Sequence, residues 1–325
     1  MATRTTATGA PPIANTSTDM RPIVFLLLAA CSSSPQQTSD AGVDGDVIAD
    51  AAVNGDTTKS DAPKTMWTPA LGERWQYQLQ GGVNASITAA PNGGGNPVAP
   101  KVFDIDLYAS DGTTPNAAGV AQVHANGAHA ICYVDAGTYE NFRPDAADYT
   151  AFDTSCGGCL LGKNNGWPGE QWLNVSDDKG QRTFILSELG KRLDKCLAAN
   201  FDGVEFDNVD GYANDTGFTI TSQTQEDFDK ALAALAHQKG LSVALKNDVD
   251  QLSDLAPFFD YAVNEQCFEF SECDQYASFL NQNKAVFNVE YNTQPSAFCA
   301  PALTAKMSAI KKDLALDATP WTPCD

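Results

Sequence analysis

The sequence predicts an α/β fold of the (β/α)8 class, the TIM barrel, formed by a single domain over residues 67–325. Short runs rich in β-branched and aromatic residues alternate with longer segments of helical periodicity. This alternation is typical of parallel strands joined by crossover helices. Eight such strand-like runs are present, and about 260 residues is a usual length for a barrel of eight strands.

The predicted strands and helices follow one another along the whole domain. The strands span residues 75–79, 103–109, 130–136, 172–175, 203–209, 241–247, 261–265 and 285–291. Helical patterns are clearest at residues 182–199, 223–239, 272–281 and 302–314. In the second of these helices, Phe228, Leu232 and Leu235 recur at helical spacing, and Gly240 ends the helix just before the next strand.

Two long connections depart from the simple alternation. Residues 81–100 are rich in Gly, Asn and Pro, which disfavour a helix. Residues 150–171 separate the third and fourth predicted strands and carry Trp167, with Trp172 just beyond them. We expect these two indole rings to form part of the wall of a cleft.

Residues 1–31 have the features of a bacterial lipoprotein signal peptide. An apolar run at residues 23–30 follows Arg21; it is too short to span a bilayer but matches the apolar region of a signal peptide. Leu28-Ala-Ala-Cys31 resembles the processing site at which the cysteine is lipidated. Met20 is an alternative start, and a plain secretory signal with a chance cysteine is an alternative interpretation. We expect export and a lipid anchor at Cys31 on the cell envelope, which membrane fractionation would test.

Residues 32–66 predict a flexible acidic linker. The segment is rich in Ser, Asp, Ala, Thr and Gly and has no aromatic residue. Such a composition cannot bury enough apolar surface to fold. Aromatic residues return at Trp67, where we place the start of the barrel domain.

The charge of the chain excludes some classes of partner. The net charge is −21, and the segment before Trp67 holds seven acidic and four basic residues, which leaves the domain with about −18. A field of this sign repels nucleic acid and anionic membrane surfaces and attracts cations. We therefore expect no nucleic-acid partner, and membrane contact only through the lipid anchor. Acidity that serves solubility alone is the simpler alternative.

The cysteines indicate disulfide bonds. Eight of the nine cysteines remain when Cys31 is set aside, and an even number in an exported domain suggests disulfides. Cys156-Gly-Gly-Cys159 also has the spacing of a metal knuckle or redox pair, but the chain has three histidines and no second motif of this kind. A structural bridge is therefore favoured over zinc. Cys267 with Cys273, and Cys299 with Cys324, are plausible local pairs, and the remaining connectivity stays open.

Carboxylates stand at the ends of several predicted strands. Together with nearby amides and one lysine they are Asp104, Asp106, Asp135, Glu205, Asp207, Lys246, Asn247, Asp248, Asn264, Glu265 and Glu290. In a closed barrel these side chains crowd one rim, where such enzymes keep their active sites. Paired carboxylates can supply the acid and the nucleophile or base of glycoside hydrolysis. The alternatives are a structural ion network around Lys246 and Arg143, or a divalent metal held by the acids. We assign neither metal nor cofactor.

The motifs along the chain resemble one known family. They are Trp75-Gln-Tyr-Gln-Leu79, Asp104-Ile-Asp-Leu-Tyr108, Cys132-Tyr-Val-Asp-Ala-Gly137, Trp167-Pro-Gly-Glu170 with Trp172-Leu-Asn-Val175, Phe201-Asp-Gly-Val-Glu-Phe-Asp-Asn-Val-Asp210 and Asn264-Glu-Gln-Cys267. Together and in this order they are similar to glycoside hydrolase family 114, the endo-α-1,4-polygalactosaminidases. The resemblance implies a TIM barrel that cleaves α-1,4-linked galactosamine polymers.

The resemblance also assigns residue roles. The catalytic aspartate of the family falls on Asp207 and its catalytic glutamate on Glu265, which we take as nucleophile and acid/base. Residues expected to contact the sugar or tune this pair are Asp106, Tyr108, Asp135, Glu205, Asn208, Asp210, Tyr212, Lys246, Tyr291 and Trp172. The expected partner is a cationic amino-sugar polysaccharide, and we expect a monomer. The alternatives are the same barrel acting on another α-linked or amino-sugar polymer, or a non-catalytic surface protein that binds glycans.

Overall fold

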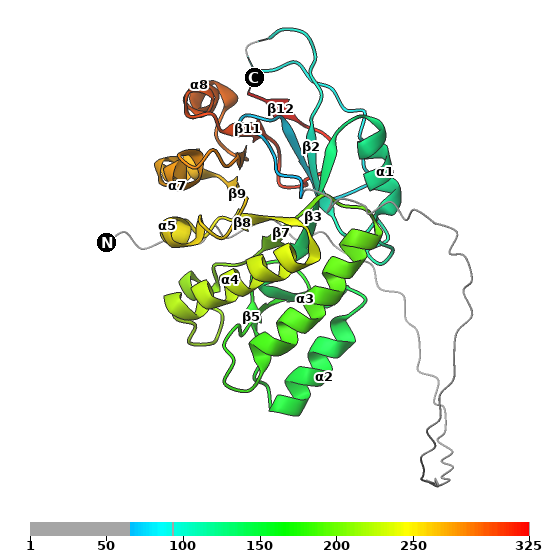
Figure 1. Cartoon of the computed structure of the whole chain (residues 1–325), viewed down its shortest axis with the longest axis vertical. Coiled ribbons are helices and arrows are strands. Elements are labelled where there is room, and N and C mark those ends of the chain that lie inside the picture. The colour runs from blue at the N-terminus through cyan, green and yellow to red at the C-terminus, as the bar shows by residue number, and fades with distance from the viewer. Residues whose placement is uncertain (1–65, 93, 325) are drawn as a thin grey trace, which may run out of the picture. The chain divides into compact units, whose positions relative to one another are not determined.

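The computed structural model describes residues 66–92 and 94–324 (Figure 1). The predicted signal peptide with Cys31, and all of the predicted linker except Met66, lie outside the described residues. Among the described residues, no helix is both long and apolar enough to cross a membrane.

The TIM-barrel prediction is confirmed. Within the described residues, eight parallel strands form the wall: β1 (Trp75–Gln78), β2 (Val102–Asp106), β3 (His129–Asp135), β7 (Gly203–Asp207), β8 (Ser242–Lys246), β9 (Tyr261–Glu265), β10 (Val286–Glu290) and β11 (Ser308–Lys311). A ninth strand, β12 (Thr322–Pro323), runs antiparallel beside β11. The segment after β11 returns to β1, where Trp321 Nε1 donates to the Trp75 carbonyl at 2.9 Å. The wall is therefore nearly closed.

One predicted barrel strand belongs elsewhere. The prediction at residues 172–175 overlaps the second half of β6 (Glu170–Leu173), which pairs with β4 (Thr138–Glu140) and β5 (Leu161–Asn164) in a separate antiparallel sheet. In the barrel, β3 pairs directly with β7, with Asp135 opposite Asp207. A short apolar run predicts a buried strand but does not indicate which strand it pairs with. The sequence pattern therefore assigned this strand to the wrong sheet.

The eighth barrel strand comes from a segment predicted as helix. Instead of one helix at residues 302–314, helix α8 (Pro295–Ala305) ends at Lys306 in the left-handed conformation, and β11 follows. Strand β11 pairs with β10, with Ser308 opposite Phe287, and most of its residues are buried. Tertiary pairing therefore overrides the helical pattern of this short segment.

The helices surround the barrel, as Figure 1 shows for α8, α7, α5, α4, α3 and α1. The remaining helices of the described residues are α1 (Ala117–Ala125), α2 (Ala146–Cys156), α3 (Gln181–Ala198), α4 (Ser222–Lys239), α5 (Leu252–Leu255), α6 (Cys267–Phe270) and α7 (Ala277–Leu280), with short 3-10 turns η1 (Gly211–Ala213), η2 (Val249–Gln251) and η3 (Cys273–Tyr276). Helix α4 ends at Gly240 as predicted, and Thr221 caps its start by accepting from the Thr224 backbone N–H. The predicted helix at residues 272–281 is divided between η3 and α7.

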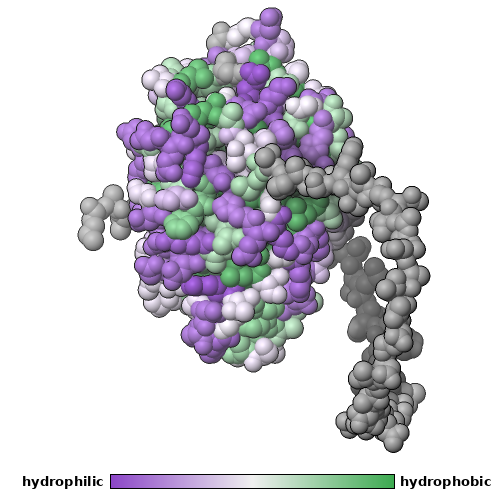
Figure 2. All heavy atoms as spheres, in the orientation of Figure 1, coloured by the Kyte–Doolittle hydropathy of each residue, from purple (hydrophilic) through white to green (hydrophobic). Residues whose placement is uncertain are grey.

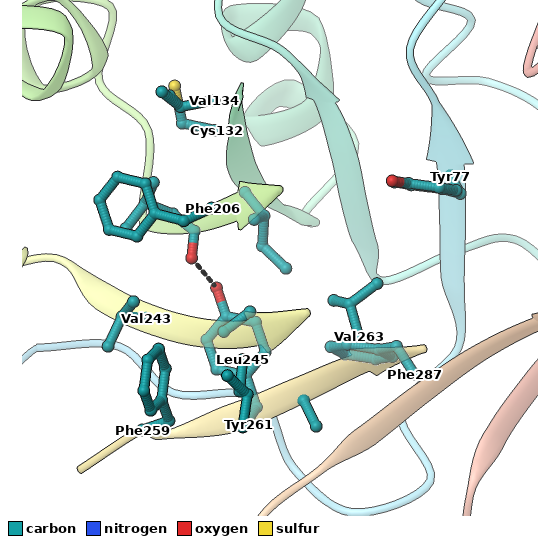
Figure 3. Packing of buried hydrophobic residues seen from close by; sticks show 14 of the residues in the cluster. Tyr77, Cys132, Val134, Phe206, Val243, Leu245, Phe259, Tyr261, Val263 and Phe287 are labelled. Carbon is teal, nitrogen blue, oxygen red and sulfur yellow. Dashed lines mark hydrogen bonds between the residues drawn. The ribbon is translucent and has the colours of Figure 1, made fainter. Parts of the chain in front are cut away.

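An aromatic layer fills the barrel below the rim. The Phe287 ring lies 5.1 Å from the Trp75 ring and 6.0 Å from the Tyr261 ring, measured between centroids. Figure 3 shows Tyr261 and Phe287 among the buried side chains, with Val263 close to Phe287. Side chains therefore fill the barrel interior, and a substrate can enter only at the rim.

The face of the domain in Figure 2 is mostly hydrophilic, with hydrophobic residues in small groups.

Four disulfides are present in the described part of the chain. They are Cys132–Cys196, Cys156–Cys159, Cys267–Cys273 and Cys299–Cys324. The two local pairs predicted from the sequence are confirmed, and Cys156 and Cys159 form a bridge as expected. The bond from Cys132 in β3 to Cys196 in α3 spans 64 residues.

We expect the Cys132–Cys196 bond to contribute most to stability. In the chain-entropy account a loop of that length contributes about 4 kcal/mol, and the loop of three residues at Cys156–Cys159 about 2 kcal/mol. The double variant Cys132→Ala/Cys196→Ala should therefore lower the free energy of unfolding by about twice as much as Cys156→Ala/Cys159→Ala. Equilibrium urea denaturation measures both, and equal losses would contradict this expectation.

Candidate active site

A buried lysine is at the centre of the rim. Lys246 ends β8, and its side chain is 2% exposed. Its Nζ donates to Asp207 Oδ1 at 2.7 Å and lies 3.3 Å from Glu265 Oε2 and 3.5 Å from Glu205 Oε1. Three carboxyl groups from β7 and β9 therefore share one ammonium. Burial alone would lower the pKa of Lys246, but Asp207, Glu265 and Glu205 raise it well above its ordinary value.

Asp207, at the end of β7, is held on both carboxylate oxygens. Oδ1 accepts from Lys246 and from the Asn208 backbone N–H at 2.8 Å, and Oδ2 accepts from the Tyr133 hydroxyl at 2.7 Å. Burial raises the pKa of Asp207, but the charge of Lys246 and these hydrogen bonds outweigh it, so the pKa is below its ordinary value. Asp207 is therefore ionised at neutral pH.

The chain turns sharply after Asp207, and this turn fixes the carboxylate. Asn208 has a φ of 60°, in the left-handed region that non-glycine residues seldom occupy. The backbone N–H groups of Ala136 and Gly137 both donate to the Asp207 carbonyl at 3.1 Å. A Cβ on Gly137 would lie 1.7 Å from the Asn208 carbonyl oxygen, so this close approach requires glycine.

Glu265, at the end of β9, faces Lys246 from the other side. Its Oε1 accepts a hydrogen bond from the Tyr291 hydroxyl, and Oε2 faces the ammonium. The Glu265 backbone N–H donates to Asn247 Oδ1 at 2.9 Å. Asn247 and Gln266 again have positive φ, at 48° and 68°. Similar strained turns therefore follow β7, β8 and β9, a feature that clusters at functional sites.

A second acidic pair lies below this site. Glu205 is fully buried and accepts from the Tyr77 hydroxyl at 3.3 Å. Burial raises the pKa of Glu205 to about 7, although Lys246 opposes the shift. Burial and the neighbouring Glu205 carboxylate raise the pKa of Asp104 well above its ordinary value. These effects favour the protonated form of Asp104, which can donate a hydrogen bond to Glu205.

An open cleft of about 500 Å³ lies above Lys246. Its walls include the predicted site residues Asp207, Glu265, Lys246, Asn208, Asp210 and Trp172. Trp167 also lines the cleft, with 56% of its surface exposed, so both predicted tryptophans form its wall. Further residues lining it are Tyr77, Leu79, Gln80, Tyr133, Glu170, Val209, Asn214, Asn247, Leu314, Ala315 and Leu316.

The other predicted contact residues lie outside this cleft. Glu205 and Asp135 are buried, and Tyr291 contacts Glu265 from behind. Tyr212 donates to Asp248 at 2.9 Å. These four side chains are not among the residues that line the cleft.

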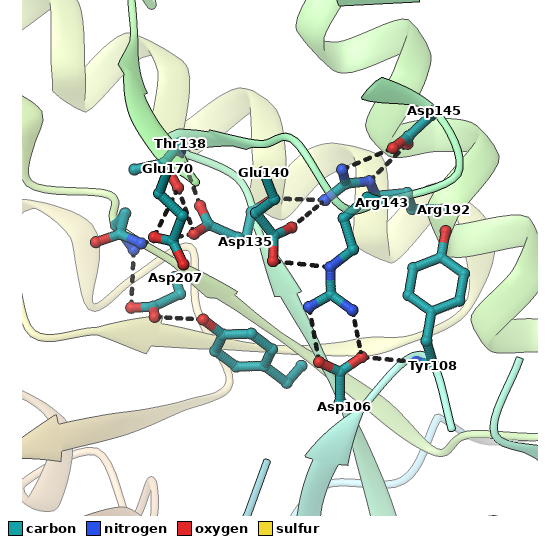
Figure 4. A network of polar contacts seen from close by, with 12 residues as sticks. Asp106, Tyr108, Asp135, Thr138, Glu140, Arg143, Asp145, Glu170, Arg192 and Asp207 are labelled. Carbon is teal, nitrogen blue, oxygen red and sulfur yellow. Dashed lines mark hydrogen bonds and ion pairs between the residues drawn. The ribbon is translucent and has the colours of Figure 1, made fainter. Parts of the chain in front are cut away.

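Asp106 and Tyr108 line a neighbouring pocket of about 240 Å³. Arg143 donates to both oxygens of Asp106, at 2.9 and 2.7 Å, and its guanidinium lies 5.1 Å from the centre of the Tyr108 ring (Figure 4). The predicted counter-charge Arg143 therefore forms an ion network beside the cleft.

Two arginines neutralise the acids of this network. Arg143 and Arg192 both bind Glu140, at 2.7 and 3.2 Å, and Arg192 also holds Asp145 (Figure 4). Oxygen atoms of Asp135, Glu140 and Glu170 lie within 4.8 Å of one another, a spacing that a metal ion can use. Because Glu140 already has two guanidinium partners, we assign no metal to this cluster.

Several residues of the cleft were given no role from the sequence. Tyr133 is two residues before Asp135 on β3 and therefore on the same face of the strand. The sequence already places it on the rim with Tyr108, Tyr212 and Tyr291. Tyr77 similarly belongs to the first motif. Leu314, Ala315 and Leu316 reach the cleft because the chain returns from β11 to β1, and no local pattern indicates that contact.

Comparison with known proteins agrees with this architecture. The Aspergillus fumigatus protein Ega3, solved in complex with galactosamine, is 32% identical, with 79% of this chain and 98% of that chain covered and a TM-score of 0.65. A variant of the glycoside hydrolase domain of PelA from Pseudomonas aeruginosa is 13% identical, with 75% and 95% covered and a TM-score of 0.50, which indicates the shared fold alone. An uncharacterized protein of Deinococcus radiodurans is 23% identical over 312 residues, 90% of this chain and 94% of that protein.

The family match covers the whole barrel. Residues 56–324 match Glycoside-hydrolase family GH114. The match includes all strands of the barrel, both walls of the cleft and the carboxylates around Lys246. The chain is therefore a glycosidase that belongs to glycoside-hydrolase family GH114.

Proposed function

We propose that this enzyme hydrolyses internal linkages of α-1,4-linked galactosamine polymers, with Asp207 as nucleophile and Glu265 as acid/base. The observation that carries the proposal is the pair of carboxyl groups that face one buried ammonium at the bottom of an open cleft. An open cleft suits attack within a polymer, because the chain can extend from both ends of the site.

The proposed roles follow from the surroundings of each carboxyl. Asp207 is kept ionised by Lys246 and Tyr133, so it has the charge that a nucleophile needs. In the first step, an Asp207 oxygen bonds to the anomeric carbon while Glu265 protonates the departing glycosidic oxygen. In the second step, Glu265 takes a proton from water, the water oxygen bonds to the anomeric carbon and the bond to Asp207 breaks.

The substrate class is supported by charge and by likeness. Ega3, the structural relative that is 32% identical, was solved with galactosamine. The predicted barrel domain has a net charge of about −18, and a polymer with free amino groups is cationic. Long-range attraction therefore favours this substrate over neutral glycans.

Substitution of either carboxyl should abolish hydrolysis. Asp207→Asn removes the nucleophile and Glu265→Gln removes the acid/base, and each should lower kcat/KM by about 10³-fold or more. Release of reducing ends from de-N-acetylated polygalactosamine measures the loss, and circular dichroism checks the fold. Asp215→Asn, an exposed residue paired with Lys163, is the charge-matched control and should retain activity. Full activity in both variants would exclude these roles.

Removal of Lys246 should shift the acidic limb of the pH profile. The ammonium lowers the pKa of Asp207, so the ionised nucleophile persists to low pH in the wild type. In Lys246→Met the pKa of Asp207 should rise, and kcat/KM should fall at a higher pH than in the wild type. A kcat/KM profile from pH 3 to 9 measures the shift. An unchanged acidic limb in a folded variant would mean that Asp207 is not the titrating group.

Hydrolysis should retain the anomeric configuration. Asp207 Oδ1 and Glu265 Oε2 lie 2.7 and 3.3 Å from the same nitrogen, so they are at most about 6 Å apart, the sum of the two distances. Retaining glycosidases separate their carboxyl groups by about 5–5.5 Å, and inverting ones by about 6.5–9.5 Å. Proton NMR of the first product should show the α-anomer before mutarotation. A β-anomer would argue for inversion and against Asp207 as nucleophile.

A further inference from the structure

We propose that Glu170 selects a free amino group on the substrate, so that the enzyme binds de-N-acetylated sugars in preference to N-acetylated ones. The inference rests on the proposed function. Glu170 begins β6 in the small sheet beside the barrel, and its side chain is partly exposed at the cleft. It has no part in the two hydrolytic steps.

Glu170 stands where two pockets meet. The cleft above Lys246 and the pocket around Arg143 share four lining residues, Leu79, Gln80, Tyr133 and Glu170. Each space also has an exposed ring, Trp167 in the cleft and Phe142, 50% exposed, in the second pocket. Exposed rings suit the apolar faces of sugars. A polymer that occupies both spaces would pass Glu170.

Glu170 differs from the other acids of this surface in its partners. Asp207 and Glu265 face Lys246, and Asp106 and Glu140 bind Arg143. By contrast, the hydrogen bonds that Glu170 accepts come from neutral groups, Asn165 Nδ2 at 2.6 Å and Thr138 Oγ1 at 3.4 Å. Within the described residues, its charge therefore lacks a cationic partner.

Negative charge close to Glu170 comes from Glu140 and Asp207. Figure 4 shows these two carboxyl groups and that of Glu170 beside the arginine network, in which Arg143 and Arg192 bind Asp106, Glu140 and Asp145. Burial raises the pKa of Glu170 to about 7, with Glu140 and Asp207 adding to the shift and the Asn165 hydrogen bond opposing it. An added positive charge would stabilise the ionised carboxylate.

A sugar ammonium supplies that charge and an N-acetyl group does not. The ammonium donates charge-assisted hydrogen bonds to the carboxylate. An N-acetyl group in the same place would bring a neutral amide and a methyl group, and would remove water from Glu170 without compensation. Discrimination therefore arises from both attraction of the amine and rejection of the acetylated sugar.

Binding to a catalytically inactive parent tests the proposal. In Asp207→Asn, calorimetry measures the affinity for galactosamine oligosaccharides and for N-acetylgalactosamine oligosaccharides of equal length. Adding Glu170→Gln should weaken binding of the free-amine oligosaccharide by about 10- to 100-fold and change binding of the acetylated one by less than about 3-fold. Glu170→Asp, which keeps the charge, should restore part of the preference.

The pH dependence gives a second readout. Because the ionised form of Glu170 binds the amine, affinity for the free-amine oligosaccharide should fall as the pH decreases through the pKa of Glu170 in the parent. That pKa is about 7 in the wild type and should be lower in the parent, which lacks the charge of Asp207. This fall should be absent in the Glu170→Gln variant. Glu73→Gln, which removes one negative charge just before β1 and far from the rim, is the matched control and should behave as the parent.

The possible failures are distinguishable. An equal loss for both oligosaccharides, or no loss, with a retained melting temperature would overturn the role of Glu170 while the hydrolase proposal stands. A parent that binds acetylated oligosaccharides as tightly as free-amine ones would also overturn it. If the parent binds neither and the wild type cleaves neither, the substrate proposal itself fails.

Discussion

The ion pairs of Lys246 are the interaction on which the rim depends. A lone ammonium in the barrel interior would be costly to bury, and so would the carboxylates of Glu205 and Asp207. Lys246 Nζ lies 2.7 Å from Asp207 and 3.5 Å from Glu205, so the opposite charges offset the free-energy cost of burying one another. The same ammonium holds Glu265, so one charge sets both the folding and the electrostatics of the site. The aromatic floor of Trp75, Tyr261 and Phe287 excludes water from below and strengthens these interactions.

Backbone geometry converts this charge centre into a fixed arrangement. The residue after each of β7, β8 and β9 has a left-handed backbone conformation, which ends the strand. Asp207, Lys246 and Glu265 are therefore the last residues of their strands and lie together on the rim. Gly137 admits the Asn208 carbonyl, which brings the β3 and β7 loops together. Strain in these turns is offset by the packing beneath them, and it reduces the freedom of the side chains at the cleft.

The sequence predicted the barrel and the central residues because both leave local signals. Alternation along strands placed Glu205 and Asp207 on one face, and the motifs identified Glu265 as the partner of Asp207. Residues 172–175 were assigned to the wrong sheet because a short apolar run does not specify its pairing partner. Residues 302–314 were predicted as one helix because local periodicity does not include the pairing of β11 with β10. The sequence also did not predict that Glu205 is fully buried below the rim. Alternation along a strand gives the direction of a side chain but not its distance from the open end of the barrel.

The distribution of cations divides the acids of the cleft into two groups. Lys246 and Arg143 satisfy the carboxylates that must keep a fixed charge or position. Glu170, which has neutral partners, retains a charge that a ligand can satisfy. The net charge of the domain can attract any polycation, but it cannot distinguish one sugar from another at close range. Discrimination requires a single desolvated group at the surface of the cleft, because only there does the difference between an ammonium and an amide change the free energy of binding.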